Sequence, residues 1–237
     1  MPRSVQGLGI SLYALFGVLV VIDLVAIAVA IHRKSLFERI LAGGDFTVRE
    51  ADLSDSLYFV VAVFQVAVNV AIFVVWLIWF YRARVNAEAY WNAERYGKGL
   101  RHGKGWAIGA WFVPFLNMVR PKSITDDIAR ASDPELLLAP KNVLGLPKPA
   151  LITVWWVAWL IDNAASRGWA SATRTDEPSA QPGIMTVEVV VTLIDIVTAV
   201  LAVLVVALIT SRQQRKNELM GRLVGQPAPP PGAWATG

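Results

Sequence analysis

Three aspartates fall inside stretches of the sequence that are otherwise apolar: Asp23, Asp162 and Asp195. An ionised carboxylate in the middle of a bilayer costs about 2.5 to 3.5 kcal/mol on insertion scales, so each should face other helices and be paired or protonated. Asn69, with a glutamine one turn earlier, is expected to donate a hydrogen bond to these groups, and Arg167 is the nearby cation. These five residues form a candidate intramembrane polar site.

The aspartates admit two interpretations. They could line the proton or cation site of a small transporter or channel, or they could form a polar cluster that holds helices together. Transporters usually carry inverted repeats or paired broken helices. The sequence shows neither, which favours the structural interpretation.

The sequence carries no motif for enzymatic chemistry. It has no G-x-S-x-G, P-loop, H-E-x-x-H or glycine-rich dinucleotide motif. Its 237 residues include no cysteine and only two histidines, His32 and His102, in separate polar segments. We therefore expect no catalytic residue, no cofactor and no metal site.

The composition predicts an all-α, polytopic helical membrane protein. Hydrophobic residues make up 55% of the chain and charged residues 17%, against about 45 to 50% and about 25% in soluble proteins. A spanning helix needs about 20 mostly apolar residues. Four segments qualify as transmembrane helices, at about 8–31, 57–81, 150–170 and 184–209. The third becomes polar after Asp162 and requires shielding by other helices.

A further apolar stretch, Trp106 to Val119, is too short to cross a bilayer and has Pro114 in its middle. We therefore predict that 104–132 is a re-entrant or interfacial helix that returns to its own side. Most of the 22 lysines and arginines then lie on the side that holds both termini, as expected for a cytoplasmic side. If the stretch crossed, most would lie outside.

The segments between the spans give further expectations. Residues 32–56 are predicted to form an outer loop, with a turn at Gly43-Gly44, and residues 82–97 to extend the second helix. Asp126 and Asp127, on a short helix at the inner surface, are expected to be solvated. We predict one membrane domain, 1–224, and a disordered proline-rich tail, 225–237.

Aromatic and basic residues indicate how the protein meets the bilayer. Trp76, Trp79, Phe80 and Tyr81 are expected at the headgroup level. The basic groups at 82–104 and 212–222 are expected to attract anionic lipids at the cytoplasmic face. We expect that the protein can bind a protein partner or form a homo-oligomer. We do not expect it to bind nucleic acid, because no basic patch is interleaved with stacking aromatics.

Several runs resemble a known family: WFYRARVNA (79–87), GWAIGAWFVPFLNMVRP (105–121), I-x-x-x-I-x-x-A-S (124–132), WWVAWL (155–160) and ITSRQQ (209–214). They resemble the bacterial membrane family catalogued as domain of unknown function 4328, over roughly residues 57 to 216. The resemblance implies a multi-pass protein of the bacterial plasma membrane and no assigned activity. The motif positions expected to matter are Asn86, Trp106, Trp111, Pro114, Asn117 and Pro121.

We expect the protein to act as a non-enzymatic interaction or envelope-associated scaffold. The alternative is a small proton- or cation-coupled transporter or channel that uses the intramembrane aspartates. Proton-dependent flux would indicate the transporter or channel and not the scaffold.

Overall fold

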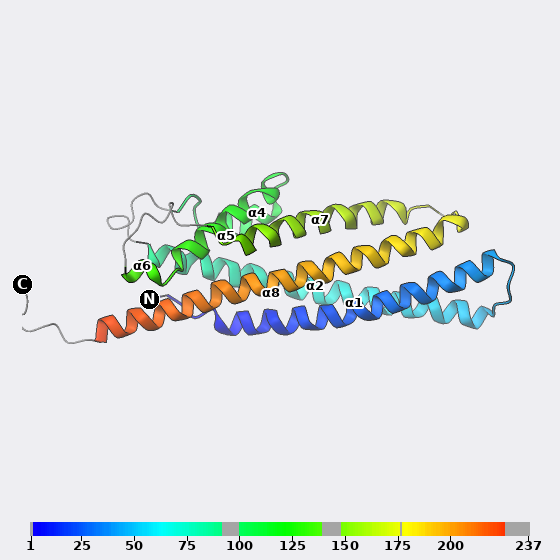
Figure 1. The fold of residues 1–237 in the computed structure, drawn as a ribbon, viewed down its shortest axis with the longest axis horizontal. Coiled ribbons are helices and arrows are strands. Elements are labelled where there is room, and N and C mark those ends of the chain that lie inside the picture. Colours follow the sequence, from blue (N-terminus) through cyan, green and yellow to red (C-terminus); the bar gives the residue numbers. More distant parts are fainter. Residues whose placement is uncertain (1, 92–99, 139–147, 176, 226–237) are drawn as a thin grey trace, which may run out of the picture.

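The computed structural model describes residues 2–91, 100–138, 148–175 and 177–225. Within these ranges every regular element is a helix. Four long helices lie side by side (Figure 1): α1 (Gln6–Leu41), α2 (Val48–Tyr90), α7 (Ala150–Ala172) and α8 (Gln181–Gly225). The short elements are α4 (Trp106–Phe112), η1 (Leu116–Met118), α5 (Arg120–Ala131), α6 (Glu135–Leu138) and η3 (Pro178–Ala180).

Helices α1, α2 and α8 contain 36, 43 and 45 residues. At a rise of 1.5 Å per residue they are about 54 to 68 Å long, well above the ~30 Å of a bilayer's hydrocarbon core. Among the described residues, these three helices are long and apolar enough to cross a membrane. They contain three of the predicted spans. The fourth, 150–170, coincides with the 23-residue helix α7, which is not one of these three.

The predicted outer loop, 32–56, is wrong. No glycine or proline follows Ile31 until Gly43, so α1 continues to Leu41. The turn is confined to residues 42–47, and Gly43 adopts the positive φ of 75° that its lack of a Cβ permits. Thr47 then caps α2 by accepting a hydrogen bond from the backbone N of Glu50 at 3.2 Å.

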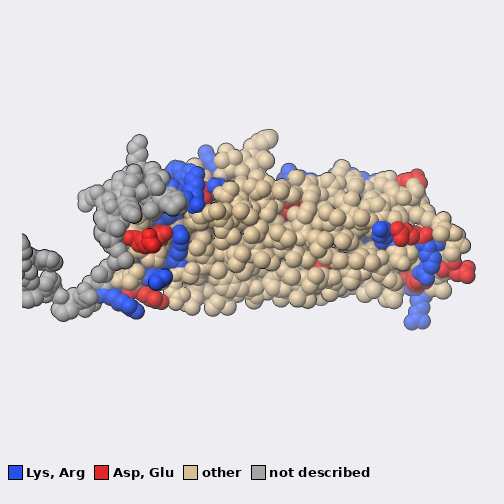
Figure 2. Space-filling model, in the orientation of Figure 1, with Lys and Arg blue, Asp and Glu red and all other residues tan. Residues whose placement is uncertain are grey.

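Helix α1 packs between α2 and α8, and α7 packs along the other side of α8. The turns that join α1 to α2 and α7 to α8 lie at one end of the bundle, here called the turn end (Figure 1). The N-terminal segment, α5 and the last turns of α8 lie at the other end, here called the α5 end. Charged side chains gather towards both ends, and the middle of the bundle is almost uncharged on the face that Figure 2 shows.

The segment 104–132 is a helical hairpin. Helix α4 ends at Phe112, two residues before Pro114, as the proline predicts. Phe115 then has φ 63°, a left-handed conformation that is strained for a residue with a large side chain. After η1 the chain continues into α5, and both ends of the segment lie at the α5 end, where Arg101 contacts Asp127 and Lys216 contacts Ala131.

The predicted extension of the second helix is confirmed as far as Tyr90. The rest of that prediction, from 92 on, lies outside the described residues. So does the proline-rich tail beyond Gly225.

Candidate functional site

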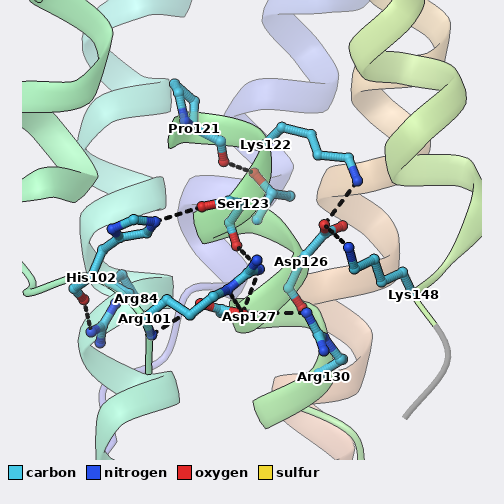
Figure 3. A network of polar contacts seen from close by, with 11 residues as sticks. Arg84, Arg101, His102, Pro121, Lys122, Ser123, Asp126, Asp127, Arg130 and Lys148 are labelled. Carbon is cyan, nitrogen blue, oxygen red and sulfur yellow. Dashed lines mark hydrogen bonds and ion pairs between the residues drawn. The ribbon is translucent and has the colours of Figure 1, made fainter. Parts of the chain in front are cut away.

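A buried ionic network surrounds α5 (Figure 3). Its centre is Asp127, whose carboxylate accepts hydrogen bonds from Arg101 Nη2 at 2.8 Å and Arg101 Nε at 3.0 Å. Arg130, one turn along the same helix, lies 3.4 Å from the same carboxylate. The side chains of Asp127 and Arg130 are each 4% exposed. This two-pronged arginine–carboxylate contact fixes α5 to the segment that precedes α4.

Asp126 forms the second half of the network. Lys122 Nζ lies 2.9 Å from its carboxylate and Lys148 Nζ lies 3.9 Å from it, and the Asp126 side chain is 1% exposed. The prediction that Asp126 and Asp127 are solvated is therefore wrong. Because α5 lies beneath residues 101–102 and beside α7, its polar face is covered, and the surrounding cations offset the cost of burying two carboxylates.

His102 and two arginines extend the network towards α2. His102 Nε2 lies 2.7 Å from Ser123 Oγ, and Arg84 donates a hydrogen bond to the carbonyl of His102. Hydrogen bonding to Asp127 raises the pKa of Arg101, so this guanidinium stays charged. Burial lowers the pKa of His102 below its ordinary value, and the neutral imidazole is favoured at this position.

Asn86, a predicted motif residue, joins the N-terminal segment, α2 and α8. Its Oδ1 accepts from the backbone N of Arg3 at 2.9 Å, and its Nδ2 donates to the Arg3 carbonyl at 2.7 Å and to Gln213 Oε1 at 2.8 Å. Gln213 in turn donates to the Ala83 carbonyl at 2.9 Å and to Ser132 Oγ at 3.0 Å. Two buried amides thus connect four segments of the chain.

Basic residues of α8 bind the end of α5. Arg212 donates to the carbonyl of Ala129 at 2.9 Å, and Lys216 donates to the carbonyl of Ala131 at 2.7 Å. Lys216 is 1% exposed and Arg84 is 3% exposed. These members of the predicted lipid-binding groups are therefore used inside the fold and are not accessible to headgroups.

Trp111, near the end of α4, lies in a cluster of aromatic rings. Its ring makes edge-to-face contacts with Trp76 and Phe80 of α2 and with Trp156 and Trp159 of α7, at centroid distances of 5.7 to 6.3 Å. Such contacts add about 0.5 to 1.5 kcal/mol each beyond the apolar area that they bury. Helix α4 and the turn that follows it, residues 106–119, are here called the wedge, and α4 is held between α2 and α7.

Three of the four α2 aromatics that were expected at the headgroup level are buried inside the bundle and do not face its surface. Trp79 and Phe80 are 0% exposed and Trp76 is 6% exposed, because α4 and α8 cover them. Trp79 Nε1 also donates to Thr210 Oγ1 of α8 at 3.1 Å. Tyr81 is half-buried.

The remaining motif residues shape the ends of the wedge. Trp106, at the start of α4, lies under the guanidinium of Arg120 at 3.7 Å from the ring centroid. Pro121 is buried in the first turn of α5, and its carbonyl accepts from Thr125 at 2.7 Å. Pro114 is exposed and Asn117 is half-buried at the tip, between the apolar side chains of Phe112, Phe115 and Val119, which are 61%, 83% and 65% exposed.

The three aspartates of the candidate intramembrane site come from three different helices, α1, α7 and α8. Asp23 is 0% exposed, and its Oδ1 accepts from Gln65 Nε2 at 2.9 Å. Asn69 was expected to be the partner, but it donates instead to the carbonyl of Gln65 on its own helix at 3.0 Å. Within the described chain, Asp23 Oδ2 and Asp162 Oδ1 have no hydrogen-bond partner.

Arg167 does not join the aspartates. It lines a separate surface pocket of about 360 Å³ together with Pro114 and Asn117 at the tip of the wedge. The structure therefore separates the predicted cation from the predicted carboxylates. In the described part of the chain, no three acidic, histidine or cysteine side chains are grouped so as to hold a metal ion.

A groove of about 760 Å³ runs between α2 and α7, with α8 as its floor. Asn69 and Asp195 line it, along with Glu188, one heptad before Asp195 on α8. Asn69 and Phe73 also line a smaller cavity of about 210 Å³ beside the tryptophan cluster. The wedge occupies the space between α2 and α7 nearest the α5 end, and the groove occupies the space towards the turn end.

These features define an all-helical protein with three helices long and apolar enough to span a membrane. The chain belongs to the family described as Domain of unknown function (DUF4328), whose family model matches residues 44–211. The match includes α2, the wedge, α5, α7 and most of α8. No curated protein and no solved structure matches the chain.

Proposed function

We propose that the chain is a four-span protein of the bacterial plasma membrane, with α7 as the fourth span. Along the middle of α7, Val154, Val157 and Ile161 are about half exposed, as are apolar side chains on the three longer helices. Exposed apolar surface at that depth is stabilised by lipid. The polar second half of α7 lies beside α8, which supplies the shielding that the sequence requires.

The wedge enters the bilayer from the α5 end and returns to it. Its strongly exposed tip, with Phe112 and Phe115, is suited to the hydrocarbon region, whereas the chain on either side carries the buried ionic network. Most of the basic residues then lie on the α5 side, and this distribution supports a cytoplasmic location for both termini.

We further propose that the α5 end is a rigid cytoplasmic surface for a protein partner, so that the protein acts as a non-enzymatic scaffold. The observation that carries this proposal is that charged side chains at that end are buried in contacts within the fold. Asp126, Asp127 and Arg130 are almost fully buried, with Asp126 paired to Lys122 and Asp127 beside Arg130. Their role is to fix helix positions, and reactive chemistry would need such groups exposed in a cleft.

Site-specific photocrosslinking in cells tests the scaffold proposal. A photoreactive residue at Glu135, exposed on α6, is expected to give one discrete adduct, with a partner or with a second copy. The matched control is Ser179, exposed at the turn end. A diffuse or absent adduct at Glu135, or the same adduct at Ser179, contradicts the proposal.

The second candidate function is a proton- or cation-coupled transporter. It is favoured by two buried carboxylate oxygens, Asp23 Oδ2 and Asp162 Oδ1, that have no hydrogen-bond partner within the described chain. In reconstituted liposomes with an internal pH-sensitive dye, this function predicts proton flux that Asp195→Asn abolishes. Flux that is absent, or unchanged by the substitution, contradicts it.

A further inference from the structure

The groove between α2 and α7 lies where a molecule dissolved in the membrane could enter it. Its α2 wall includes Val66 and Val70, which are 64% and 59% exposed, and its α7 wall includes Trp169. The groove is lined mainly by apolar side chains. Its volume of about 760 Å³ lies in the range of about 300 to 1,000 Å³ that is typical of small-molecule sites.

Besides Tyr58, the ionisable side chains that line the groove are acidic. Glu188 and Asp195 contribute carboxyl groups from α8, and among the described lining residues there is no lysine or arginine. Arg33, which does not line the groove, stacks on the Tyr58 ring at 4.1 Å, is paired with Asp55 at 3.2 Å and acts electrostatically on Glu188. The groove therefore offers negative charge in a medium where an unpaired carboxylate is costly.

The adjoining cavity, which shares Asn69 and Phe73 with the groove, has walls suited to a cation. Four tryptophans line it: Trp76, Trp111, Trp155 and Trp159. The face of an indole ring attracts a positive charge, by about 2 kcal/mol or more where water is excluded. The groove and the cavity thus combine apolar walls, two carboxyl groups and aromatic faces.

These observations select one class of ligand. A small hydrated metal ion would gain nothing from the apolar walls, and an anion would be repelled by Glu188 and Asp195. A neutral lipid chain would offer no positive charge to Asp195. We propose that the groove binds a lipophilic monovalent cation, a molecule with a bulky apolar body and a single positive charge, which it takes up from the membrane.

This inference goes beyond the scaffold proposal and does not depend on it, since it concerns binding within the membrane and not at the α5 end. It also requires no transport. Tetraphenylphosphonium is a suitable probe because tetraphenylborate has nearly the same shape and the opposite charge.

Equilibrium dialysis of the full chain in phosphatidylcholine nanodiscs tests the proposal, with protein-free nanodiscs to correct for partitioning. Saturable binding of one tetraphenylphosphonium per chain is expected, without saturable binding of tetraphenylborate. Asp195→Asn should weaken the binding by at least about tenfold, or about 1.4 kcal/mol. Glu218→Gln, an exposed substitution on α8 outside the groove, should leave it unchanged.

A steric pair of variants keeps the test decisive if Asp195→Asn does not fold. Val66→Trp adds bulk to the groove wall and should abolish saturable binding, whereas Val63→Trp, at a position that is 50% exposed and not part of the lining, should not. Equal binding of the two probe ions, no saturable binding of the cation, or full binding by Asp195→Asn or Val66→Trp would each overturn the proposal.

Discussion

Asn86 and Gln213, 127 residues apart in the sequence, form a buried hydrogen bond in which Asn86 Nδ2 donates to Gln213 Oε1 at 2.8 Å. Through their remaining donors and acceptors the two amides also hold Arg3, Ala83 and Ser132. This pair joins the N-terminal segment, α2, α5 and α8 at one point. The α5 end is therefore built as a single unit, and its stability should depend on each amide.

Gln213→Ala is expected to lower the free energy of unfolding by about 2 to 4 kcal/mol, because it leaves Asn86 and Ser132 with buried groups that have lost a partner. Gln214→Ala is the matched control, since the Gln214 side chain, next in the sequence, is exposed and donates to Glu218 of the same helix. It should change stability by less than about 0.5 kcal/mol. Thermal unfolding in detergent measures both, and equal effects would contradict the role given to Gln213.

Asp127→Ala should destabilise the protein by about 3 kcal/mol, because it removes a buried carboxylate that contacts Arg101 and lies 3.4 Å from the buried Arg130. Part of the loss is relieved by water at Arg101, whose side chain is 36% exposed. Glu135→Ala, which removes an exposed carboxylate from α6, should have little effect. Chemical denaturation followed by tryptophan fluorescence measures the difference. Similar midpoints for the two variants would show that the network does not stabilise α5.

Stability should fall as the pH falls through the titration of His102. Burial lowers the pKa of His102 below its ordinary value of 6.5, and the charges of Arg120, Arg101 and Arg84 lower it further, against the opposing effect of Asp127. Between the lowered and the ordinary pKa the unfolded chain binds more protons than the folded chain. The contribution of the neutral imidazole is therefore complete above about pH 6.5 and is lost as the pH decreases through the lowered value.

The His102→Gln variant should lose less of its thermal stability than the wild type between about pH 7 and pH 5, because glutamine does not titrate. Melting temperatures across this range measure the difference. Gln214→Ala, at an exposed position of α8, is the control and should show the wild-type slope. An identical slope for His102→Gln and wild type would rule out this histidine as a pH-dependent element.

Trp111→Ala should cost about 3 to 5 kcal/mol, because it removes a ring that contacts four others and leaves a cavity between α2 and α7. Trp111→Phe retains part of the contact and should cost less. Phe115→Ala, at a side chain that is 83% exposed, should leave stability in detergent almost unchanged. Thermal unfolding of the three variants in one detergent gives the order, and a loss for Phe115→Ala as large as that for Trp111→Ala would contradict the wedge assignment.

The sequence predicts the helices well because apolar runs and breakers are local signals. Pro114 correctly marks the end of α4, and Gly43 correctly marks a turn. The predicted outer loop is too long because hydropathy detects where the apolar run ends, whereas the helix itself continues through polar residues to Leu41, just before Gly43. The motif identifies Asn86 and Trp111 as important positions, but it does not identify the side chains that they contact.

The pairing of polar groups could not be predicted, because it depends on which helix faces come together. Asp126 and Asp127 are charged and adjacent, a pattern typical of a solvated helix, and they are buried because Arg101 contacts Asp127 while Lys122 and Lys148 contact Asp126. Similarly, Asn69 and Gln65 lie one turn apart on α2, and the approach of α1 decides that Gln65 is the residue that meets Asp23.

The central claim is that the chain crosses the membrane four times and that the wedge returns to the cytoplasmic side. With no native cysteine, single cysteines can be placed at Glu135, Ser179 and Glu218, all of which are exposed; Ser132 is unsuitable because it is buried. In intact cells, a membrane-impermeant maleimide should label the cysteine at 179 and should label those at 135 and 218 only after the cells are opened. Labelling at 135 in intact cells would contradict the account.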